Sequence, residues 1–138
     1  MTTAEDNVDI VRRAFKGFQR LDLDAFTADW APDITWDLAG YEGWPGAHTT
    51  YTGEHEVVAE FAQYLGSARS LEVTDHEITP LDDGRVLGTH RERRVNEGEE
   101  TPTDLVIEAL YTFDKGKITH VAVYTGHGEA RKAAGRTS

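Results

Sequence analysis

Four strand-like segments follow one another in the second half of this 138-residue chain. They cover residues 70–81, 85–95, 103–113 and 117–125, separated by the turn sequences DDG (82–84), NEGEE (96–100) and DKGK (114–117). Turns this short join antiparallel neighbours, because parallel strands need a long crossover between them. The second half of the chain therefore predicts an antiparallel meander, and this feature restricts the possible folds more than any other.

The segment 103–113 indicates which side chains share a face of the sheet, because side chains alternate along a strand. One face carries Leu105, Ile107, Ala109, Tyr111 and Phe113. We expect this face to be turned toward the core. The other face carries Asp104, Val106, Glu108, Leu110 and Thr112. Since this second set is too apolar to face only water, we expect a partner subunit to cover it.

The first half of the chain carries helical patterns instead. Val8, Val11, Phe15 and Phe18 recur at spacings of three and four, after a capping box of Thr2 and Glu5. A second helix is predicted from Leu23 to Trp30, ended by Pro32. A third contains the stripe Val57, Phe61, Tyr64 and Leu65 and stops at Gly66. Helices followed by a meander predict a single α+β domain over residues 1–138, with helices covering one face of a curved sheet and leaving a cavity.

Charge and composition exclude several classes of function. The formal net charge of -11 argues against binding to nucleic acid or to anionic membranes, which need a basic face. With no cysteines, there are no disulfides and no thiolate metal ligands. The chain shows no bilayer-length apolar run and no secretory signal, so we expect a cytoplasmic protein. The absence of metal-binding, phosphate-binding and dinucleotide motifs predicts no metal and no cofactor.

An aromatic, glycine-rich stretch at residues 39–53 suggests a ligand. It follows the short strand ITWDL at 34–38, and its Tyr41, Trp44, His48 and Tyr51 could close over a bound molecule. Within the strand, the apolar neighbours Ile34 and Leu38 place Trp36 inward and Asp37 outward. The pattern predicts a pocket for a hydrophobic small molecule.

The most polar strand segment, His90 to Arg94, offers chemistry but leaves its register open. If His90 and Glu92 face inward, the pocket gains an imidazole and a carboxylate that can move a proton. If Arg91 and Arg93 face inward, it gains cations suited to an enolate or carboxylate. In a third arrangement these charges all lie in solvent. Asp75 and Glu77 raise the same question, because they share the parity of Leu71 and Val73; solvent exposure is the expectation for both acids.

Three stretches give the chain a family resemblance. VRRAFKGFQRLDLDAFTADWAPDITWDL (11–38), YTGEHEVVAEF (51–61) and VIEALYTFDKGKITHVAVYTGHGEA (106–130) occur in an order that resembles the NTF2-like superfamily, and its SnoaL-like branch most closely. The resemblance implies a cone-shaped α+β barrel with a deep pocket, often dimeric through the outer sheet face. Members of the superfamily include polyketide cyclases, ketosteroid isomerases, epoxide hydrolases, dehydratases and binding modules, so the fold does not select a reaction.

The chain departs from these relatives at their functional positions. The tyrosine and two aspartates of the ketosteroid isomerases fall on Ala14, Leu38 and Ala109. The last-strand acid of the limonene-type epoxide hydrolases falls on Val123, and the acid near the sheet end of many SnoaL-like sequences falls on Gly126. Neither established mechanism is therefore expected.

The sequence thus leads to a cofactor-free isomerase, cyclase or lyase acting on a hydrophobic, oxygenated substrate, with a non-catalytic binding module as the alternative. His90 and Glu92 would move the proton, and Arg91 or Tyr111 would stabilise developing negative charge. Trp36, Tyr41 and Trp44 would hold and cover the substrate. The remaining substrate-binding residues expected along the pocket wall are Leu38, Ile107, Ala109 and Val123.

Overall fold

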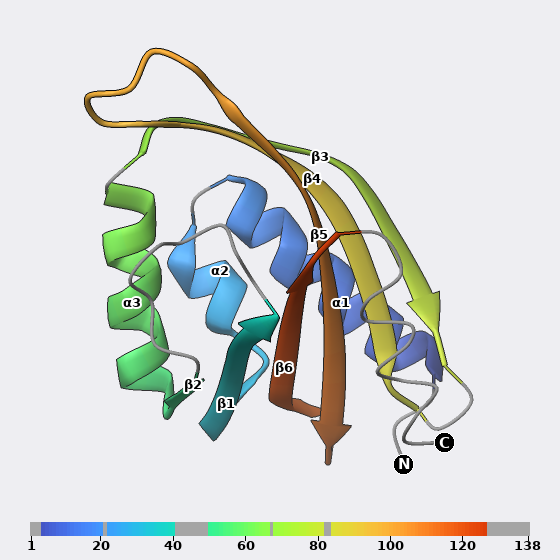
Figure 1. Cartoon of the computed structure of the whole chain (residues 1–138). Helices are drawn as coiled ribbons and strands as arrows, with labels where there is room; N and C mark the ends of the chain where they lie inside the picture. Colours follow the sequence, from blue (N-terminus) through green and yellow to red (C-terminus); the bar gives the residue numbers. More distant parts are fainter. Residues whose placement is uncertain (1–3, 21, 41–49, 67, 82–83, 127–138) are drawn as a thin grey trace.

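The computed structural model describes residues 4–20, 22–40, 50–66, 68–81 and 84–126. The elements in chain order are α1 (Ala4–Gln19), α2 (Leu23–Thr27), β1 (Trp30–Gly40), β2 (Thr50–Thr52), α3 (Glu54–Gly66), β3 (Ala68–Pro80), β4 (Val86–Asn96), β5 (Thr103–Asp114) and β6 (Lys117–Thr125). Figure 1 shows the three helices gathered on the concave side of one strongly curved sheet. This arrangement confirms the predicted NTF2-like α+β fold.

The sheet has six strands in the order β2-β1-β6-β5-β4-β3. The four predicted meander strands are present, and each pairs antiparallel with the next. The pairing of β1 with β6 is parallel and joins the first strand of the chain to the last. It was not predicted, because a contact between residues so distant in sequence leaves no local pattern. The short β2 then extends the sheet beyond β1.

The helices largely follow the predicted patterns. Val11, Phe15 and Phe18 of α1 are all buried, as their spacing requires. The side chain of Asp22 caps α2 by accepting a hydrogen bond from the backbone of Ala25. The two helices meet at Gly17, where an added Cβ would lie 2.6 Å from the backbone nitrogen of Phe26. The predicted cap residue Thr2 lies outside the described residues.

Two boundaries around the first strand differ from the prediction. The second helix ends at Thr27 rather than at Trp30, which is the first residue of β1. Trp30 is taken into the sheet because it pairs with Ile118 of β6, whose backbone N–H also donates to the carbonyl of Asp29. The strand expected at 34–38 therefore runs from 30 to 40. Tertiary pairing overrode the local helical preference here.

A β-bulge in β3 settles the orientation of the acids on that strand. Thr74 pairs with Arg91 and Glu77 pairs with Thr89, so that Asp75 and His76 together lie opposite His90. Asp75 takes a φ of 57°, the left-handed conformation that Asp tolerates better than most residues. The extra residue shifts the alternation by one position. Val73 is buried before the bulge, while Asp75 and Glu77 are both exposed, as expected for these two acids.

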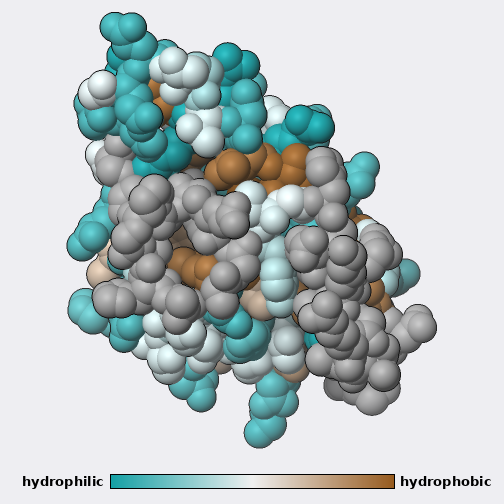
Figure 2. All heavy atoms as spheres, in the orientation of Figure 1, coloured by the Kyte–Doolittle hydropathy of each residue, from teal (hydrophilic) through white to brown (hydrophobic). Residues whose placement is uncertain are grey.

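The predicted alternation of β5 is confirmed. Ile107, Ala109 and Tyr111 belong to the main core between the sheet and the helices, with Leu105 and Phe113 packed at its edge. Leu110 and Ala122 form a separate small cluster with Leu81 and Tyr124. In Figure 2, apolar surface shows near the centre of this face of the molecule, and hydrophilic side chains dominate its periphery.

Candidate functional site: an aromatic pocket with a histidine–glutamate pair

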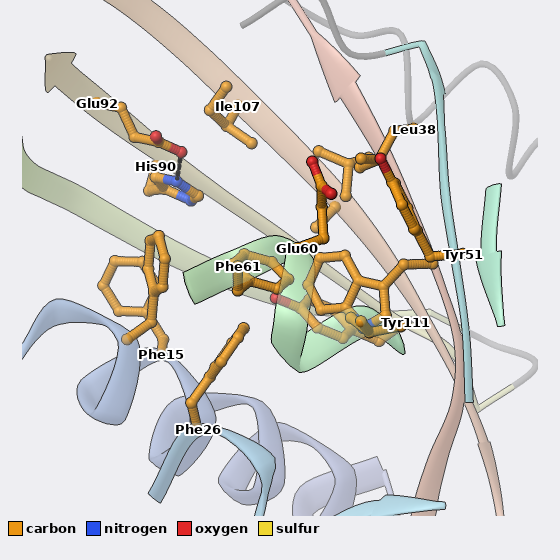
Figure 3. A pocket seen from close by; sticks show the side chains of 15 residues that line it. Phe15, Phe26, Leu38, Tyr51, Glu60, Phe61, His90, Glu92, Ile107 and Tyr111 are labelled. Carbon is orange, nitrogen blue, oxygen red and sulfur yellow. Dashed lines mark hydrogen bonds and ion pairs between the residues drawn. The ribbon is translucent and has the colours of Figure 1, made fainter. Parts of the chain in front are cut away.

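A pocket lies between the concave face of the sheet and the helices. Its empty volume is about 770 Å³ when the part open to solvent is included. A largely apolar lining with a few polar groups suits a small organic molecule. The lining is mostly apolar and aromatic: Phe15, Phe18, Phe26, Trp36, Leu38, Tyr51, Val57, Glu60, Phe61, His90, Glu92, Ile107, Ala109, Tyr111 and Val123. Figure 3 shows these side chains converging from α1, α2, α3 and the sheet.

His90 and Glu92 form the polar centre of one wall. The Nε2 atom of His90 lies 2.8 Å from Oε2 of Glu92, and their side chains are only 11% and 5% exposed. Both come from β4, two residues apart, so the alternation of the strand turns them to the same face (Figure 3). An ionised carboxylate can only accept hydrogen bonds. With Glu92 ionised, Nε2 therefore carries the hydrogen, and Nδ1 is left as the basic nitrogen of the ring.

The pairing of β4 with β5 decides the register that the sequence left open. His90 lies opposite Ile107 and Glu92 lies opposite Leu105, two residues of the inward face of β5. Arg91 and Arg93 consequently point to the other side of the sheet, and both are exposed. Arg91 was predicted to bind the substrate, but the structure places it outside the pocket lining. Its side chain is 60% exposed and lies 3.6 Å from Asp75, in an ion pair outside the pocket.

A second histidine stands beside this pair. The bulge in β3 turns His76 inward, where its ring stacks on Phe15 with centroids 3.5 Å apart and lies 6.5 Å from the ring of His90. Burial, and then the charges of His90 and Arg12, lower the pKa of His76 from 6.5 to about 4. His76 also lines a polar groove with Arg12, Lys16 and Gln19. No local pattern indicated this placement, because the bulge carries no glycine.

The predicted apolar wall is formed by neighbouring strands. Leu38 of β1, Val123 of β6, Ala109 of β5 and Ile107 of β5 all line the pocket. Tyr111 lines it as well, and burial raises the pKa of its hydroxyl far above the usual value, so the group stays protonated. Tyr51 pairs with Trp36 across β2 and β1, which places both side chains on the inner face. Tyr41, Trp44 and His48 lie outside the described residues.

Several residues line the pocket although the sequence did not predict them as ligand contacts. The phenylalanines were expected only as core residues, yet Phe15, Phe18, Phe26 and Phe61 line the cavity. Glu60 of α3 also lines it and points toward Tyr51 and Leu38 in Figure 3. The signal for Glu60 was its spacing, since a residue three positions after Val57 lies on the same helical face.

Two possible features are absent from the part of the chain that the structure describes. No three His, Asp or Glu side chains there lie close enough together to hold a metal ion. Among the same residues, no helix is long and apolar enough to cross a membrane.

Comparison with known proteins identifies the family. The model of the SnoaL-like domain matches residues 11–121 of this chain. The chain belongs to the SnoaL-like family. This SnoaL-like protein is 28% identical over 123 residues to the uncharacterized protein Rv0034 of Mycobacterium tuberculosis, covering 88% of this chain and 90% of that protein. The uncharacterized protein Mb0035 of Mycobacterium bovis is similar to the same extent.

Solved structures share the fold of the SnoaL-like protein at low sequence identity. Bal32a, from a soil-derived mobile gene cassette, superposes with a TM-score of 0.78 at 22% identity and covers 90% of this chain and 92% of its own. TerC, co-crystallized with polyporic acid, gives a TM-score of 0.75 at 17% identity over 92% and 96%. A proposed polyketide cyclase from Xanthomonas campestris gives 0.73 at 23% identity over 99% and 100%.

Proposed function

We propose that this SnoaL-like protein is a cofactor-independent acid–base catalyst that moves a proton on a hydrophobic, oxygenated small molecule. Proton removal beside a carbonyl group is a common first step of isomerisation, cyclisation and lyase reactions. The observation that carries the proposal is the buried hydrogen bond between His90 and Glu92 in the wall of an aromatic pocket. Buried imidazole–carboxylate pairs are suited to general base work, because the carboxylate orients the ring and stabilises the imidazolium that forms.

The proposed step is the removal of a proton from the carbon next to a carbonyl group. Nδ1 of His90 takes the proton, and the imidazolium is stabilised by its bond from Nε2 to Glu92. The electrons of the broken C–H bond pass to the carbonyl oxygen, which becomes an enolate. Tyr111 lines the same pocket and its hydroxyl stays protonated, so this hydroxyl is the proposed donor to that oxygen. The imidazolium returns the proton at a second position.

The remaining lining residues would hold the substrate. Trp36, Leu38 and Val123 offer an apolar wall on the side away from His90. Ile107 and Ala109 lie on β5, between the strand of Val123 and the strand of His90. Tyr41 and Trp44 stay predicted cover residues. A flat, largely apolar carbon skeleton suits such surroundings, since apolar contact supplies affinity and a few polar groups fix the orientation.

Deuterium exchange into a bicyclic ketone tests the proposal. With 2-tetralone in deuterium oxide, we expect the wild-type protein to accelerate exchange at the carbon beside the carbonyl, as followed by proton NMR. His90→Gln keeps a hydrogen-bond donor for Glu92 but removes the base, so the acceleration should be lost. Glutamine is preferred to alanine because alanine would remove the partner of a buried carboxylate and destabilise the fold. His55→Gln, at an exposed position on α3, is the matched control.

The alternative is a binding module without catalysis. The observation that favours it is the apolar character of Leu38, Ala109 and Val123, which line the pocket where related enzymes carry acids. Binding of 2-tetralone without faster exchange, or equal exchange in wild type and His90→Gln, would support this alternative. The homodimer through the outer sheet face and the cytoplasmic location remain predictions, and analytical ultracentrifugation checks the first.

A further inference from the structure

The indole N–H of Trp36 is a buried donor with no hydrogen-bond acceptor among the described residues. Trp36 is only 6% exposed and lines the pocket. Buried tryptophan N–H groups usually donate a hydrogen bond, and leaving such a donor without an acceptor costs about 1–3 kcal/mol. An orphaned donor at the wall of a ligand pocket points to an acceptor that arrives with the ligand.

The aromatic neighbours of Trp36 do not supply that acceptor. Its ring is surrounded by Phe26, Phe61 and Trp30, with centroid distances of 6.0, 4.9 and 5.5 Å. These side chains offer ring faces, which accept hydrogen bonds far more weakly than oxygen does. The indole nitrogen is buried and makes no hydrogen bond in this structure. A ligand oxygen inserted here would therefore gain a bond in a site of low polarity.

Trp36 and His90 lie at opposite corners of the pocket floor. Their strands, β1 and β4, are separated by β6 and β5. Three strand spacings correspond to about 14 Å along the sheet, a span that its curvature and the two side chains shorten. The residues are also offset along the strands, because Trp36 pairs with Val121 whereas His90 pairs with Ile107. A molecule that reaches both corners must be extended.

We propose that the indole N–H of Trp36 binds an acceptor oxygen at the end of the ligand opposite to the end that meets His90. The inference deepens the proposed function and rests on it for the role of His90. It defines the substrate class: a skeleton of at least two fused rings, apolar across its middle, with a carbonyl or ether oxygen at the far end. Trp36 is then a specificity-determining residue, and its ring is more than an apolar wall.

Two nearly isosteric probes test this assignment without any turnover. The ketone 2-acetylnaphthalene carries the acceptor, and 2-ethylnaphthalene lacks it. Isothermal titration calorimetry on the wild type should show tighter binding of the ketone. Trp36→Phe keeps an aromatic ring but removes the N–H, so the preference for the ketone should fall about five- to tenfold, the value of one hydrogen bond. Affinity for the hydrocarbon should change less than about twofold.

Two control variants separate the possible outcomes. Trp30→Phe alters a buried neighbour that does not line the pocket, and it should keep the preference for the ketone. His90→Gln should keep it as well, because the oxygen is held at the other corner. A preference that disappears with His90→Gln and survives Trp36→Phe would overturn the inference. Failure of the ketone to bind the wild type would also overturn it.

A spectroscopic measurement on the wild type makes the test independent of how well the variant folds. In ¹H–¹⁵N spectra, the side-chain N–H signal of Trp36 should move downfield when 2-acetylnaphthalene binds and stay nearly unmoved with 2-ethylnaphthalene. An unmoved signal at saturation with the ketone contradicts the inference. If the wild type did not accelerate exchange in 2-tetralone while its Trp36 signal still responded to 2-acetylnaphthalene, the proposed reaction would be refuted and the binding assignment would stand.

Discussion

Replacing His76 with asparagine should make the stability of the protein less sensitive to acid. His76 prefers to be neutral in the folded chain, because its pKa is lowered from 6.5 to about 4 by burial and by the charges of His90 and Arg12. The unfolded chain takes up this proton near pH 6.5, whereas the folded chain does so only near pH 4. The stabilising contribution is therefore complete above pH 6.5 and is lost as the pH falls from 6.5 to 4.

The size of the effect follows from the two pKa values. A pKa difference between 6.5 and about 4 corresponds to at most ~3.4 kcal/mol of unfolding free energy. Because the ring is only partly buried and borders the polar groove, solvent screening reduces this figure to about 1–2 kcal/mol. Wild type should lose that much more stability than His76→Asn between pH 7.5 and pH 4.

Urea unfolding followed by tryptophan fluorescence at pH 7.5, 6.5, 5.5, 4.5 and 4 measures this difference. Carboxylates that titrate in the same range act on both proteins, so only the difference between the two profiles reports on His76. His55→Asn, an exposed histidine on α3, should follow the wild type closely. Parallel profiles for wild type and His76→Asn would refute the reasoning, since they would mean that the imidazole is solvated as well in the folded chain as in the unfolded one.

Two further predictions concern stability. Gly17→Ala should cost about 1–3 kcal/mol by urea unfolding, because its Cβ would lie 2.6 Å from the backbone nitrogen of Phe26, whereas Gly66→Ala, with open space around it, should be neutral or stabilising; equal effects would contradict the close approach of α1 and α2. Lys115→Asn should stabilise by about 0.5–1 kcal/mol, because Lys115 and the following glycine both have positive φ in the turn before β6, and Asn suits that conformation. Lys117→Asn is the control for scanning calorimetry, and a melting temperature that rises equally in both variants would count against this explanation.

Local signals in the sequence were sufficient for much of the fold. The turns at 82–84, 96–100 and 114–117 set the meander, and the alternation of Ile107, Ala109 and Tyr111 set its inner face. The parallel pairing of β1 with β6 depends on residues that are about 85 positions apart, as in the pair Trp36 and Val121, and leaves no local signal. For the same reason the sequence placed the end of the second helix too late.

The site was less predictable than the fold, because it depends on register. Which of the residues from His90 to Arg94 face inward is decided by their pairing with β5, and the polar turn between the strands does not fix that pairing to the residue. His76 reaches the neighbourhood of His90 only through the bulge at Asp75, a position where glycine would have been the usual signal. The orphaned N–H of Trp36 could not be foreseen, since it depends on what its three-dimensional neighbours lack.

The extra residue in the bulge of β3 affects how the fold tolerates a change in the length of this strand. If Asp75 were deleted, Val73, His76 and Ile78 would still alternate correctly toward the interior, because the remaining residues could match β4 one to one. The shortened strand would bend less, because a bulge increases the local twist of the strand that carries it. The edge strand β3 arches over α1 in Figure 1, so a deletion of this one residue would change the curvature of the sheet beside α1 while every inward-facing side chain stayed the same.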